Sequence, residues 1–260
     1  MRLRLDISYD GTDFAGWARQ PGQRTVQGEL EAALARILRA DVSLTVAGRT
    51  DAGVHSTGQV AHADVAAEPD ASLLRRLSGV LPPDIRVRAV SRAPEGFDAR
   101  FSATYRRYVY RISDAPWGVE PVRRLDTLPW PRPLEEAAMQ QAAAAFLGEH
   151  DFAAYCRRRE GATTIRTVQQ MDCRRDGDLI AVTVQADAFC HQMVRSLVGA
   201  LLAVGDGRRT EAWPGELLDL TERANTVVVA PARGLTLVEV GYPPPGELAA
   251  RAELTRRKRG

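Results

Sequence analysis

The chain has 260 residues and a net charge of +2, and its 45% hydrophobic and 26% charged residues are ordinary for a soluble globular protein. A chain of this length can bury a core as one large domain or two small ones, and its three cysteines and four scattered histidines make neither a disulfide framework nor a structural zinc site. No apolar run reaches the roughly 18 to 20 residues that span a bilayer, and the N-terminus lacks a signal or transit peptide pattern, so we expect a cytoplasmic protein.

The first part of the chain predicts strands and helices in the order β-α-β-β-α-β. Apolar residues that alternate with polar ones indicate strands over about 3–9, 42–46, 59–65 and 85–89. Thr25 can cap a helix that ends near Leu38, because apolar residues from Val26 onward fall on one helical face. A shorter helix is predicted over about 71–79.

The second part repeats this order. Strands are predicted over about 108–112, 164–171, 179–186 and 235–241, and helices over about 133–147 and 192–204. Pro133 suits the start of the first of these helices, and Gly148 suits its C-cap. Two such repeats predict an α+β fold of two ferredoxin-like halves whose antiparallel sheets are joined.

The domain organisation follows from this repeat. We expect an N-terminal half over residues 1–102 and a C-terminal half over residues 103–243. Residues 244–260 are Pro-rich and then charged, which is typical of a mobile tail. The segment 113–133, rich in Pro, Trp and Arg, is expected to cross between the halves.

Arginine dominates the basic side chains, since Lys258 is the single lysine among 35 Lys and Arg residues. A guanidinium can donate two hydrogen bonds to a phosphate and stack on a base, which suits RNA, although a GC-rich genome explains the same excess. Arginines cluster in the middle of the chain at Arg106–Arg107, Arg123–Arg124, Arg157–Arg158–Arg159 and Arg174–Arg175. Such clusters fit a selective nucleic-acid binder, but basic surface patches also serve solubility.

One loop concentrates the residues that could do chemistry. The stretch Ala47–His55 reads AGRTDAGVH, lies between two predicted strands and contains two glycines that allow a tight turn. Asp51 could act as a nucleophile or a base, and Arg49, two residues away, favours its ionised form. A turn in which Asp51 only accepts hydrogen bonds from backbone amides explains the same spacing.

The run GRTDAGVHSTGQVAH closely resembles the signature of the tRNA pseudouridine synthase A family. Four further segments resemble family segments in the same order: YDGTDFAGWARQPGQRTVQGELEAAL, FDARFSATYRRYVYRI, AFCHQMVRSLVGALLAVG and APARGLTLVEVGYP. The resemblance covers about residues 3–243, and several separated matches in the right order are not expected by chance. Tyr105 and Gln192 depart from the family, which commonly has a smaller residue and a second histidine at these positions.

The resemblance implies roles for four residues. Asp51 is implied to be the catalytic nucleophile, and Tyr108 is implied to stack on the target base. Arg195 is implied to pair with Asp51, and Arg49 to help flip or hold the target nucleotide. From the residue pattern alone, Tyr108 on an alternating strand would be a core residue, and Arg195 among apolar neighbours would need a charged partner.

The resemblance also implies a reaction: isomerisation of uridine to pseudouridine at positions 38, 39 and 40 of the tRNA anticodon stem-loop. The family acts as a homodimer, with RNA held in a central cleft. No cofactor or metal is needed, because the glycosidic bond is broken and remade through C5 with no change in composition, and the chain has no Walker, Rossmann or metal-ligand motif. A carboxylate can stabilise the positive charge at the sugar, and an aromatic face can offset roughly 1–3 kcal/mol of base unstacking.

Two other functions remain open. A non-catalytic RNA-binding module would keep the scaffold, but Asp51, Tyr108 and Arg195 are all present, which disfavours it. A hydrolase of glycosidic bonds normally needs a pair of carboxylates, and Asp64 and Glu68 lie well downstream of the loop.

Other polar residues are expected to be structural. We interpret His55, His62 and His191 as hydrogen-bonding residues rather than acid–base groups, and the cysteines as small buried hydrophobes. The region Asp151–Tyr155 either lines the RNA cleft or belongs to the ordinary core, and the sequence favours neither.

Overall fold

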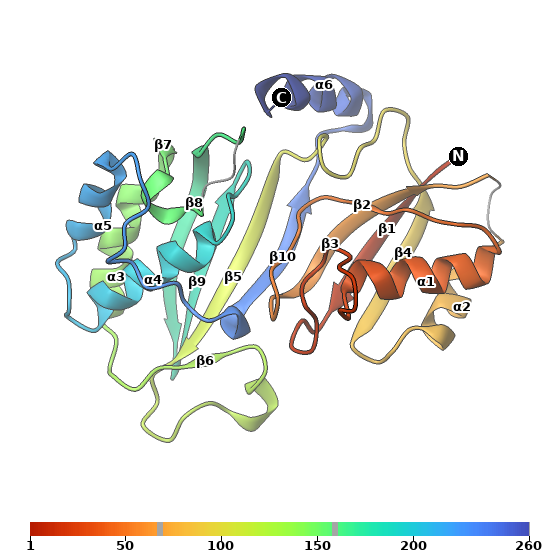
Figure 1. Cartoon of the computed structure of the whole chain (residues 1–260). Coiled ribbons are helices and arrows are strands. Elements are labelled where there is room, and N and C mark those ends of the chain that lie inside the picture. The colour runs from red at the N-terminus through yellow and green to blue at the C-terminus, as the bar shows by residue number, and fades with distance from the viewer. Residues whose placement is uncertain (67–69, 158–160, 260) are drawn as a thin grey trace. The chain divides into compact units, whose positions relative to one another are not determined.

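The computed structural model describes residues 1–66, 70–157 and 161–259, which form a mixed α/β protein (Figure 1). The chain divides into two compact units, one made of residues 1–104 with 237–260 and the other of residues 105–236. The boundary at residue 104 lies close to the predicted one. Residues 237–243, predicted to end the second half, belong instead to the first unit, where the Leu237 carbonyl oxygen accepts a hydrogen bond from the Ser56 hydroxyl at 2.9 Å.

The first unit is built around a sheet. Its strands are β1 (Arg2–Tyr9), β2 (Thr45–Val46), β3 (His55–Asp64), β4 (Ile85–Arg92) and most of β10 (Leu235–Gly241). β1 lies between β3 and β4 and is antiparallel to both, and the strand order is β4-β1-β3-β10. Every second residue of β1 is buried, as its alternating sequence predicted.

Two helices, α1 (Val26–Leu38) and α2 (Leu73–Val80), complete the core of this unit and lie close to their predicted ranges. α1 begins as predicted, because the Thr25 hydroxyl accepts a hydrogen bond from the Gly28 amide at 3.2 Å. Apolar side chains of both helices are fully buried in one cluster with β1, so the helices cover the sheet with their apolar faces.

β2 is shorter than the sequence predicted. It holds only Thr45 and Val46, which pair with β3. The amide of Leu44 donates to the carboxylate of Glu31 on α1 at 2.9 Å rather than to a neighbouring strand. An alternating pattern does not reveal such a side-chain partner, so the strand was predicted to start too early.

β3 is longer than the sequence predicted, since it begins at His55. Its first residues are polar and carry no apolar alternation. They join the sheet because Ser56 lies opposite Tyr9 and donates its hydroxyl to the Leu237 carbonyl oxygen at 2.9 Å. Tertiary pairing therefore extends the strand to the edge of the predicted reactive loop.

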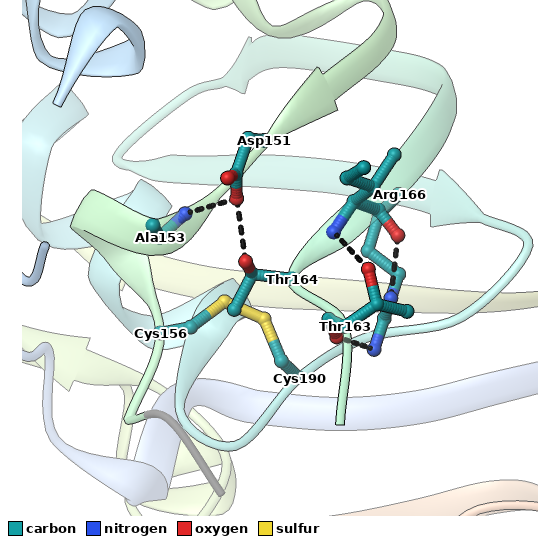
Figure 2. The surroundings of a disulfide bond; sticks show 8 residues. Asp151, Ala153, Cys156, Thr163, Thr164, Arg166 and Cys190 are labelled. Carbon is teal, nitrogen blue, oxygen red and sulfur yellow. Dashed lines mark hydrogen bonds between the residues drawn. A yellow bond between two sulfur atoms is a disulfide. The ribbon is translucent and has the colours of Figure 1, made fainter. Parts of the chain in front are cut away.

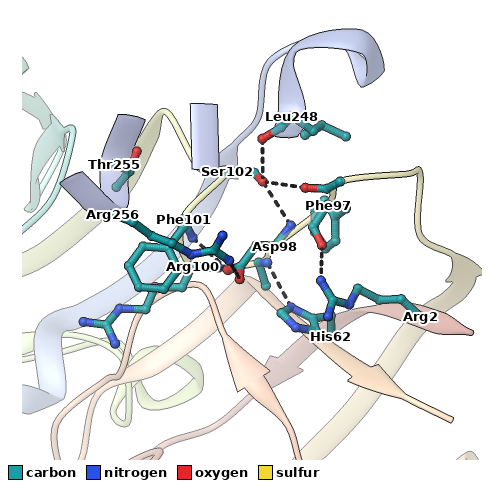
Figure 3. Close-up of polar contacts among 12 residues, drawn as sticks. Arg2, His62, Phe97, Asp98, Arg100, Phe101, Ser102, Leu248, Thr255 and Arg256 are labelled. Atoms are coloured by element: carbon teal, nitrogen blue, oxygen red, sulfur yellow. Dashed lines mark hydrogen bonds and ion pairs between the residues drawn. The ribbon is translucent and has the colours of Figure 1, made fainter. Parts of the chain in front are cut away.

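Residues after 243 form α6 (Leu248–Arg259), where the sequence predicted a mobile tail. Figure 3 shows the Ser102 hydroxyl donating to the Leu248 carbonyl oxygen at 3.1 Å. Arg256 donates to the carboxylate of Asp98 at 2.9 Å, and the Leu248 side chain is only 3% exposed. The prediction of a mobile tail is wrong, because a Pro-rich and charged composition does not reveal partners that lie far away in the sequence.

The second unit contains its own sheet. Its strands are β5 (Tyr105–Ser113), β6 (Leu128–Pro129), β7 (Gly148–Asp151), β8 (Ile165–Asp176) and β9 (Leu179–Ala186). β9 lies between β5 and β8 and is antiparallel to both, and β7 pairs with β8 at the far side. β9 covers the predicted residues, and every second residue of it is buried.

The helices of the second unit are α3 (Glu136–Ala143), α4 (Met193–Gly205) and the short α5 (Trp213–Glu216). α4 packs against α3 and is buried along most of its length. α3 is shorter than the predicted 133–147: it begins after Glu135, whose amide donates to the Gly205 carbonyl oxygen at 2.9 Å, and a 3-10 turn follows it. Packing on α4 thus decides where this helix starts.

The segment 113–133 stays within the second unit and does not cross between the halves, so that prediction is wrong. It contains a 3-10 turn (Pro121–Arg123) and β6, which runs parallel to β5 with Leu128 opposite Ile112. Composition indicates an irregular segment, but it does not indicate where the two ends of that segment lie.

Candidate active site

The predicted reactive loop lies in the first unit as residues 47–54, between β2 and β3. Arg49 is exposed, Asp51 is half-buried, and Thr50 between them is only 6% exposed. Thr50 therefore packs into the unit, while Arg49 and part of Asp51 remain accessible to a ligand. The predicted location of the loop between two strands is confirmed, and its chemical role stays a prediction.

Backbone hydrogen bonds fix both ends of the loop. The Ala47 amide donates to the Val60 carbonyl oxygen at 2.8 Å, and the Val54 amide donates to the Asp51 carbonyl oxygen at 3.2 Å. Gly53 has a φ of +77°, so the predicted tight turn forms in the left-handed region that glycine adopts most easily. The backbone on either side of Asp51 is thus held within the unit.

The segment after β1 packs directly on the loop. The Trp17 amide donates to the Thr50 carbonyl oxygen at 3.0 Å, and the Gly53 amide donates to the Phe14 carbonyl oxygen at 3.3 Å. Gly16 has a φ of +99°, and a Cβ there would lie 2.8 Å from the Thr50 carbonyl oxygen. Only glycine allows this approach, so residues 14–17 form a close-fitting support beneath the loop.

Buried polar side chains of β1 and β3 also meet the loop. The Tyr9 hydroxyl lies 2.8 Å from the Thr50 hydroxyl, and the Gln59 amide nitrogen donates to Tyr9 at 3.2 Å and to the Gly48 carbonyl oxygen at 2.8 Å. The sequence does not single out either residue as a site residue, because Tyr9 ends the strand predicted over about 3–9 and Gln59 begins the strand predicted over about 59–65. The sequence indicates them only in that Tyr9 and Gln59 lie within the family-like segments YDGT and STGQVAH, respectively.

His55 follows the loop and has a structural contact, as predicted. Its Nδ1 lies 3.0 Å from the Gly11 amide and 3.1 Å from the Asp10 carboxylate. The Gly11 amide is the donor in the first of these contacts. Burial acts to raise the pKa of Asp10, but hydrogen bonds from Thr12 and His55 outweigh it and leave the pKa below its usual value.

The other two histidines have different outcomes. His62 Nδ1 accepts a hydrogen bond from the Ala99 amide at 3.0 Å, which confirms its predicted structural role (Figure 3). Burial lowers the pKa of His62, so its ring is neutral over most of the physiological range. The role of His191 stays a prediction.

Tyr108 lies in the second unit, on β5 opposite Val184 of β9. Its side chain is 7% exposed, and its ring meets that of Phe189 edge to face, with the centroids 5.3 Å apart. This environment is that of a core aromatic residue, which was the interpretation from the residue pattern alone. Its role in base stacking stays a prediction.

Arg195 lies in the first turn of α4, in the second unit, and is half-buried. Its Nε donates to the Ala230 carbonyl oxygen at 2.6 Å, and the Ala230 amide donates to the Arg195 carbonyl oxygen at 3.0 Å. These two hydrogen bonds fix the first turn of the helix against residue 230. The predicted ion pair with Asp51 joins the two units and stays a prediction.

A disulfide bond joins Cys156 to Cys190, whose Cα atoms are 5.7 Å apart (Figure 2). The expectation that the cysteines are small buried hydrophobes is wrong for this pair and is confirmed for Cys173, a buried free thiol. Two cysteines 34 residues apart share no motif, so their spacing did not indicate a bond. Cys190 directly precedes the segment that begins α4, so the bond restrains the chain on the N-terminal side of Arg195.

The region Asp151–Tyr155 lies beside this disulfide. The Asp151 carboxylate accepts hydrogen bonds from the Ala153 amide at 3.0 Å and the Thr164 hydroxyl at 2.5 Å (Figure 2). Tyr155 is fully buried and donates its hydroxyl to the Pro214 carbonyl oxygen at 2.6 Å. Of the two interpretations of this region, ordinary core is the one that these contacts support.

Several arginines of the predicted clusters have structural contacts within their unit. Arg106 is 4% exposed and donates to the Asp187 carbonyl oxygen at 2.9 Å. Arg175 forms an ion pair with Asp114 at 2.8 Å. Arg158 and Arg159 lie outside the described residues. The clusters are therefore a weaker sign of RNA binding than their sequence suggested.

The predicted site residues thus fall into two pairs. Arg49 and Asp51 share the loop of the first unit, and Tyr108 and Arg195 belong to the second unit. Among the described residues, no three His, Cys, Asp or Glu side chains are grouped to bind a metal ion. Within the same ranges, no helix combines the length and the apolar character needed to cross a membrane.

Comparison with known proteins identifies relatives over nearly the whole chain. A protein named tRNA pseudouridine synthase A from Frankia casuarinae is 63% identical over 98% of this chain and 94% of the relative. Proteins with the same name from Streptomyces griseus and Mycobacterium leprae are 57% and 53% identical, over 100% and 98% of this chain and 94% of each relative.

Among solved structures, the similarity is much weaker. The structure titled "Structure of H/ACA RNP bound to a substrate RNA containing 2'-deoxyuridine" is 14% identical, with a TM-score of 0.32. The match covers 77% of this chain and 53% of that one. A score this low supports no argument about the function of this chain.

The family described as tRNA pseudouridine synthase matches residues 7–102 and 142–243. Arg49, Asp51 and Arg195 lie within the matched stretches, and Tyr108 lies between them. Both the extent of this match and the identity to the relatives lead to one conclusion. The chain belongs to the tRNA pseudouridine synthase A family, a family of isomerases.

Proposed function

We propose that this chain isomerises uridine to pseudouridine at positions 38, 39 and 40 of the tRNA anticodon stem-loop, with Asp51 as the nucleophile. Membership of the family supports the reaction. The observation that carries the role of Asp51 is its setting: a half-buried carboxylate on a loop anchored at both ends, beside an exposed arginine. A reactive group needs both access to the substrate and a fixed position.

The proposed reaction exchanges one bond to the sugar for another and needs a single carboxylate as the reactive group. The bond between N1 and C1′ breaks, the base turns, and a bond between C5 and C1′ forms, while C5 loses a proton and N1 gains one. Asp51 either attacks an electrophilic carbon of the nucleotide or stabilises the positive charge that develops at the sugar. Neither route consumes a cofactor, and we propose that the enzyme uses no cofactor and no metal.

Three further residues complete the proposal. Arg49 is exposed next to the nucleophile and helps to flip or hold the target nucleotide, because a guanidinium can bind a phosphate with two hydrogen bonds. Tyr108 stacks on the target base, and Arg195 pairs with Asp51. Because the Tyr108 ring is buried and packs against Phe189, this role requires that the ring be more exposed when RNA is bound than it is in this structure.

The protein acts in this proposal as a homodimer in the cytoplasm, with the tRNA contacting both subunits. We also propose that the chain folds as two ferredoxin-like halves around an RNA-binding cleft. In the first unit, the element order β1-α1-β2-β3-α2-β4 supports the ferredoxin-like description. The oligomeric state is measured by light scattering on the purified protein, where a monomer at working concentration contradicts the dimer.

The test is tritium release from tRNA transcripts labelled at uridine C5, without added cofactor. Three transcripts, each with one labelled uridine at position 38, 39 or 40, separate the positions. We expect release by the wild type from all three. Asp51→Asn is expected to abolish release and to keep tRNA binding within a few-fold, because it removes the nucleophile and preserves the shape of the loop.

Asp41→Asn is the matched control, since Asp41 is exposed on a loop of the same unit and the same atoms are exchanged. We expect its rate to equal that of the wild type. Measurable turnover by pure Asp51→Asn contradicts the assignment of the nucleophile. Binding of tRNA without tritium release by the wild type points instead to a non-catalytic RNA-binding module.

A further inference from the structure

A chain of buried hydrogen bonds runs from β3 through β1 to the loop that carries Asp51. The Gln59 amide nitrogen donates to the Tyr9 hydroxyl oxygen at 3.2 Å. The Tyr9 hydroxyl is then free to donate to the Thr50 hydroxyl, 2.8 Å away. Thr50 directly precedes Asp51, so the chain of bonds ends one residue from the proposed nucleophile.

All three side chains are removed from water. Gln59 is 0%, Tyr9 5% and Thr50 6% exposed. A buried polar group costs free energy unless it is hydrogen-bonded, and apolar residues would fill the same space without that risk. Three polar side chains that satisfy one another here are therefore difficult to explain by core packing alone.

Gln59 also reaches the other side of the loop. The same amide nitrogen donates to the Gly48 carbonyl oxygen at 2.8 Å, and the side-chain oxygen accepts from the Val60 amide at 3.2 Å. Both polar atoms of the Gln59 amide therefore have partners, and its rotamer is fixed. It bonds the loop at Gly48 and, through Tyr9, at Thr50, which are the residues on either side of Arg49.

An irregularity in β1 directs the Tyr9 side chain toward Thr50. The register between β1 and β3 shifts between Ile7 and Tyr9, an irregularity of the kind that redirects side chains near functional sites. Burial raises the pKa of Tyr9 to about 12. Its hydroxyl is therefore neutral at any working pH and serves as a hydrogen-bonding group rather than as a base.

We propose that Tyr9 and Gln59 are positioning residues for catalysis, which hold the segment Gly48–Asp51 so that Arg49 and Asp51 keep their reactive orientation. The inference rests on the proposed role of Asp51 as the nucleophile. Positioning matters because a displacement of about 1 Å at a reacting group can cost on the order of 100-fold in rate. Neither residue needs to touch the RNA for this effect.

The test compares variants that remove single atoms from the chain of bonds. Tyr9→Phe removes only the hydroxyl, and Thr50→Val replaces the hydroxyl of its partner with a methyl group. We expect each to lower kcat by roughly 10- to 100-fold and to leave KM within about threefold, because the substrate still binds and the nucleophile is misplaced. Thr50→Ser keeps the hydroxyl and is expected to retain a kcat within about threefold of the wild type.

The double variant makes the test specific. If Tyr9 and Thr50 act through one shared hydrogen bond, Tyr9→Phe with Thr50→Val loses no more activity than the worse single variant. Tyr242→Phe is the matched control in the same unit, because it also removes a tyrosine hydroxyl, one that donates to the Ala99 carbonyl oxygen at 2.8 Å. We expect its kcat to stay within about twofold, with all rates measured well below each melting temperature.

Each outcome has a defined meaning. The proposal is overturned if kcat is unchanged in folded Tyr9→Phe and Thr50→Val. It is also overturned if these variants lose no more activity than Tyr242→Phe. A fully additive loss in the double variant overturns it as well. If Thr50→Val does not fold, Gln59→Met, which removes the amide at similar length, takes its place with the same expectation. Asp51→Asn in the same assay separates the two proposals: its activity tests the nucleophile, and that of Tyr9→Phe tests the positioning.

Discussion

In the first unit, hydrogen bonds from neighbouring strands hold the loop that carries Asp51, whereas in the second unit a disulfide and a backbone carbonyl hold the start of α4, which carries Arg195. The loop joins two strands of one sheet, so side chains from adjacent strands are close enough to hold it. The start of α4 lies at a chain segment outside the strands, where Arg223 donates to the Gln192 side-chain oxygen at 3.0 Å. Its N-cap residue, Gln192, has a φ of +66° and makes no side-chain cap.

A non-glycine residue with left-handed backbone costs of order 1–3 kcal/mol, and a helix without a cap leaves amides unsatisfied. The Met193 amide, at the start of the helix, donates to the Cys190 carbonyl oxygen at 3.0 Å, so this amide has an acceptor. The Arg157 amide donates to the His191 carbonyl oxygen at 3.0 Å and thereby holds the segment that precedes the helix. Asp51 and Arg195, which are proposed to act in one reaction, are thus held by different interactions: side-chain hydrogen bonds in the first unit, and a disulfide and backbone hydrogen bonds in the second. We therefore expect reduction of the disulfide and substitution of single side chains to affect the two units differently.

The largest effect on stability is expected from breaking the disulfide. Reduction, or Cys156→Ala with Cys190→Ala, removes a crosslink that spans 34 residues, which corresponds to about 3–4 kcal/mol of unfolding free energy in the chain-entropy model. The measurement is the urea midpoint with and without a reductant. Cys173→Ala is the control, because its midpoint should respond to reductant as the wild type does.

An unchanged midpoint under reductant would mean that the bond does not restrain the folded protein. The experiment also tests whether the protein is suited to the cytoplasm, where cysteine thiols are kept reduced. In the cytoplasm that we propose, the enzyme would work largely without this crosslink, and the reduced protein must then remain folded and active.

A smaller effect is expected from Arg195→Ala. It should lower the unfolding free energy by about 1–3 kcal/mol, because the Ala230 carbonyl oxygen loses its donor, and it should also lower activity. Arg209→Ala is the control, an exposed arginine of the same unit that stacks on Trp213. Unchanged melting and rate in Arg195→Ala would show that neither its contact with Ala230 nor its role in the reaction matters.

Combining Arg195→Ala with Asp51→Asn tests the predicted ion pair. If the two residues pair, removing the carboxylate charge makes the loss of the arginine less costly, and the two stability effects do not add. Additive losses would contradict the pair and leave Arg195 as a residue held by its own unit alone.

The smallest effect concerns two ion pairs that differ in exposure and in one backbone hydrogen bond. Asp114 and Asp64 each accept two hydrogen bonds at 2.8 Å from an arginine, Arg175 and Arg2 respectively, but their side chains are 9% and 65% exposed. Asp114 also accepts a hydrogen bond from the Leu134 amide at 2.8 Å. The hydrogen bond from the arginine holds the pKa of each carboxyl below its usual value. We expect Asp114→Asn to cost about 1 kcal/mol at pH 7 and Asp64→Asn a few tenths, because water screens the exposed pair.

The sign of the pH dependence follows from the lowered pKa. Each carboxylate stabilises the folded state above the pKa of about 4 that it has when unfolded, and this stabilisation is lost as the pH falls through the lower folded pKa. The difference between wild type and variant should therefore shrink below about pH 4. A larger loss for Asp64→Asn than for Asp114→Asn would contradict the assignment of the difference to burial and to the hydrogen bond from Leu134.

The regular elements were predictable where a local pattern carries their signal. The alternation of β1 and β9, and the Thr25 cap of α1, depend on residues that are neighbours in the sequence. The early start of β3, the later start of α3 and the helix α6 were not predictable, because distant partners decide them. Leu237, Gly205 and Ser102 are such partners.

The candidate site shows the same division. The family, the composition of the loop and its position between two strands are predictable from the residues alone, because glycines, arginine and aspartate at these spacings are local features. What holds the loop is visible only in the folded chain, since Tyr9 lies 41 residues from Thr50 and 50 from Gln59. Strand register brings these side chains together, and register is set by the packing of the whole sheet rather than by any one segment.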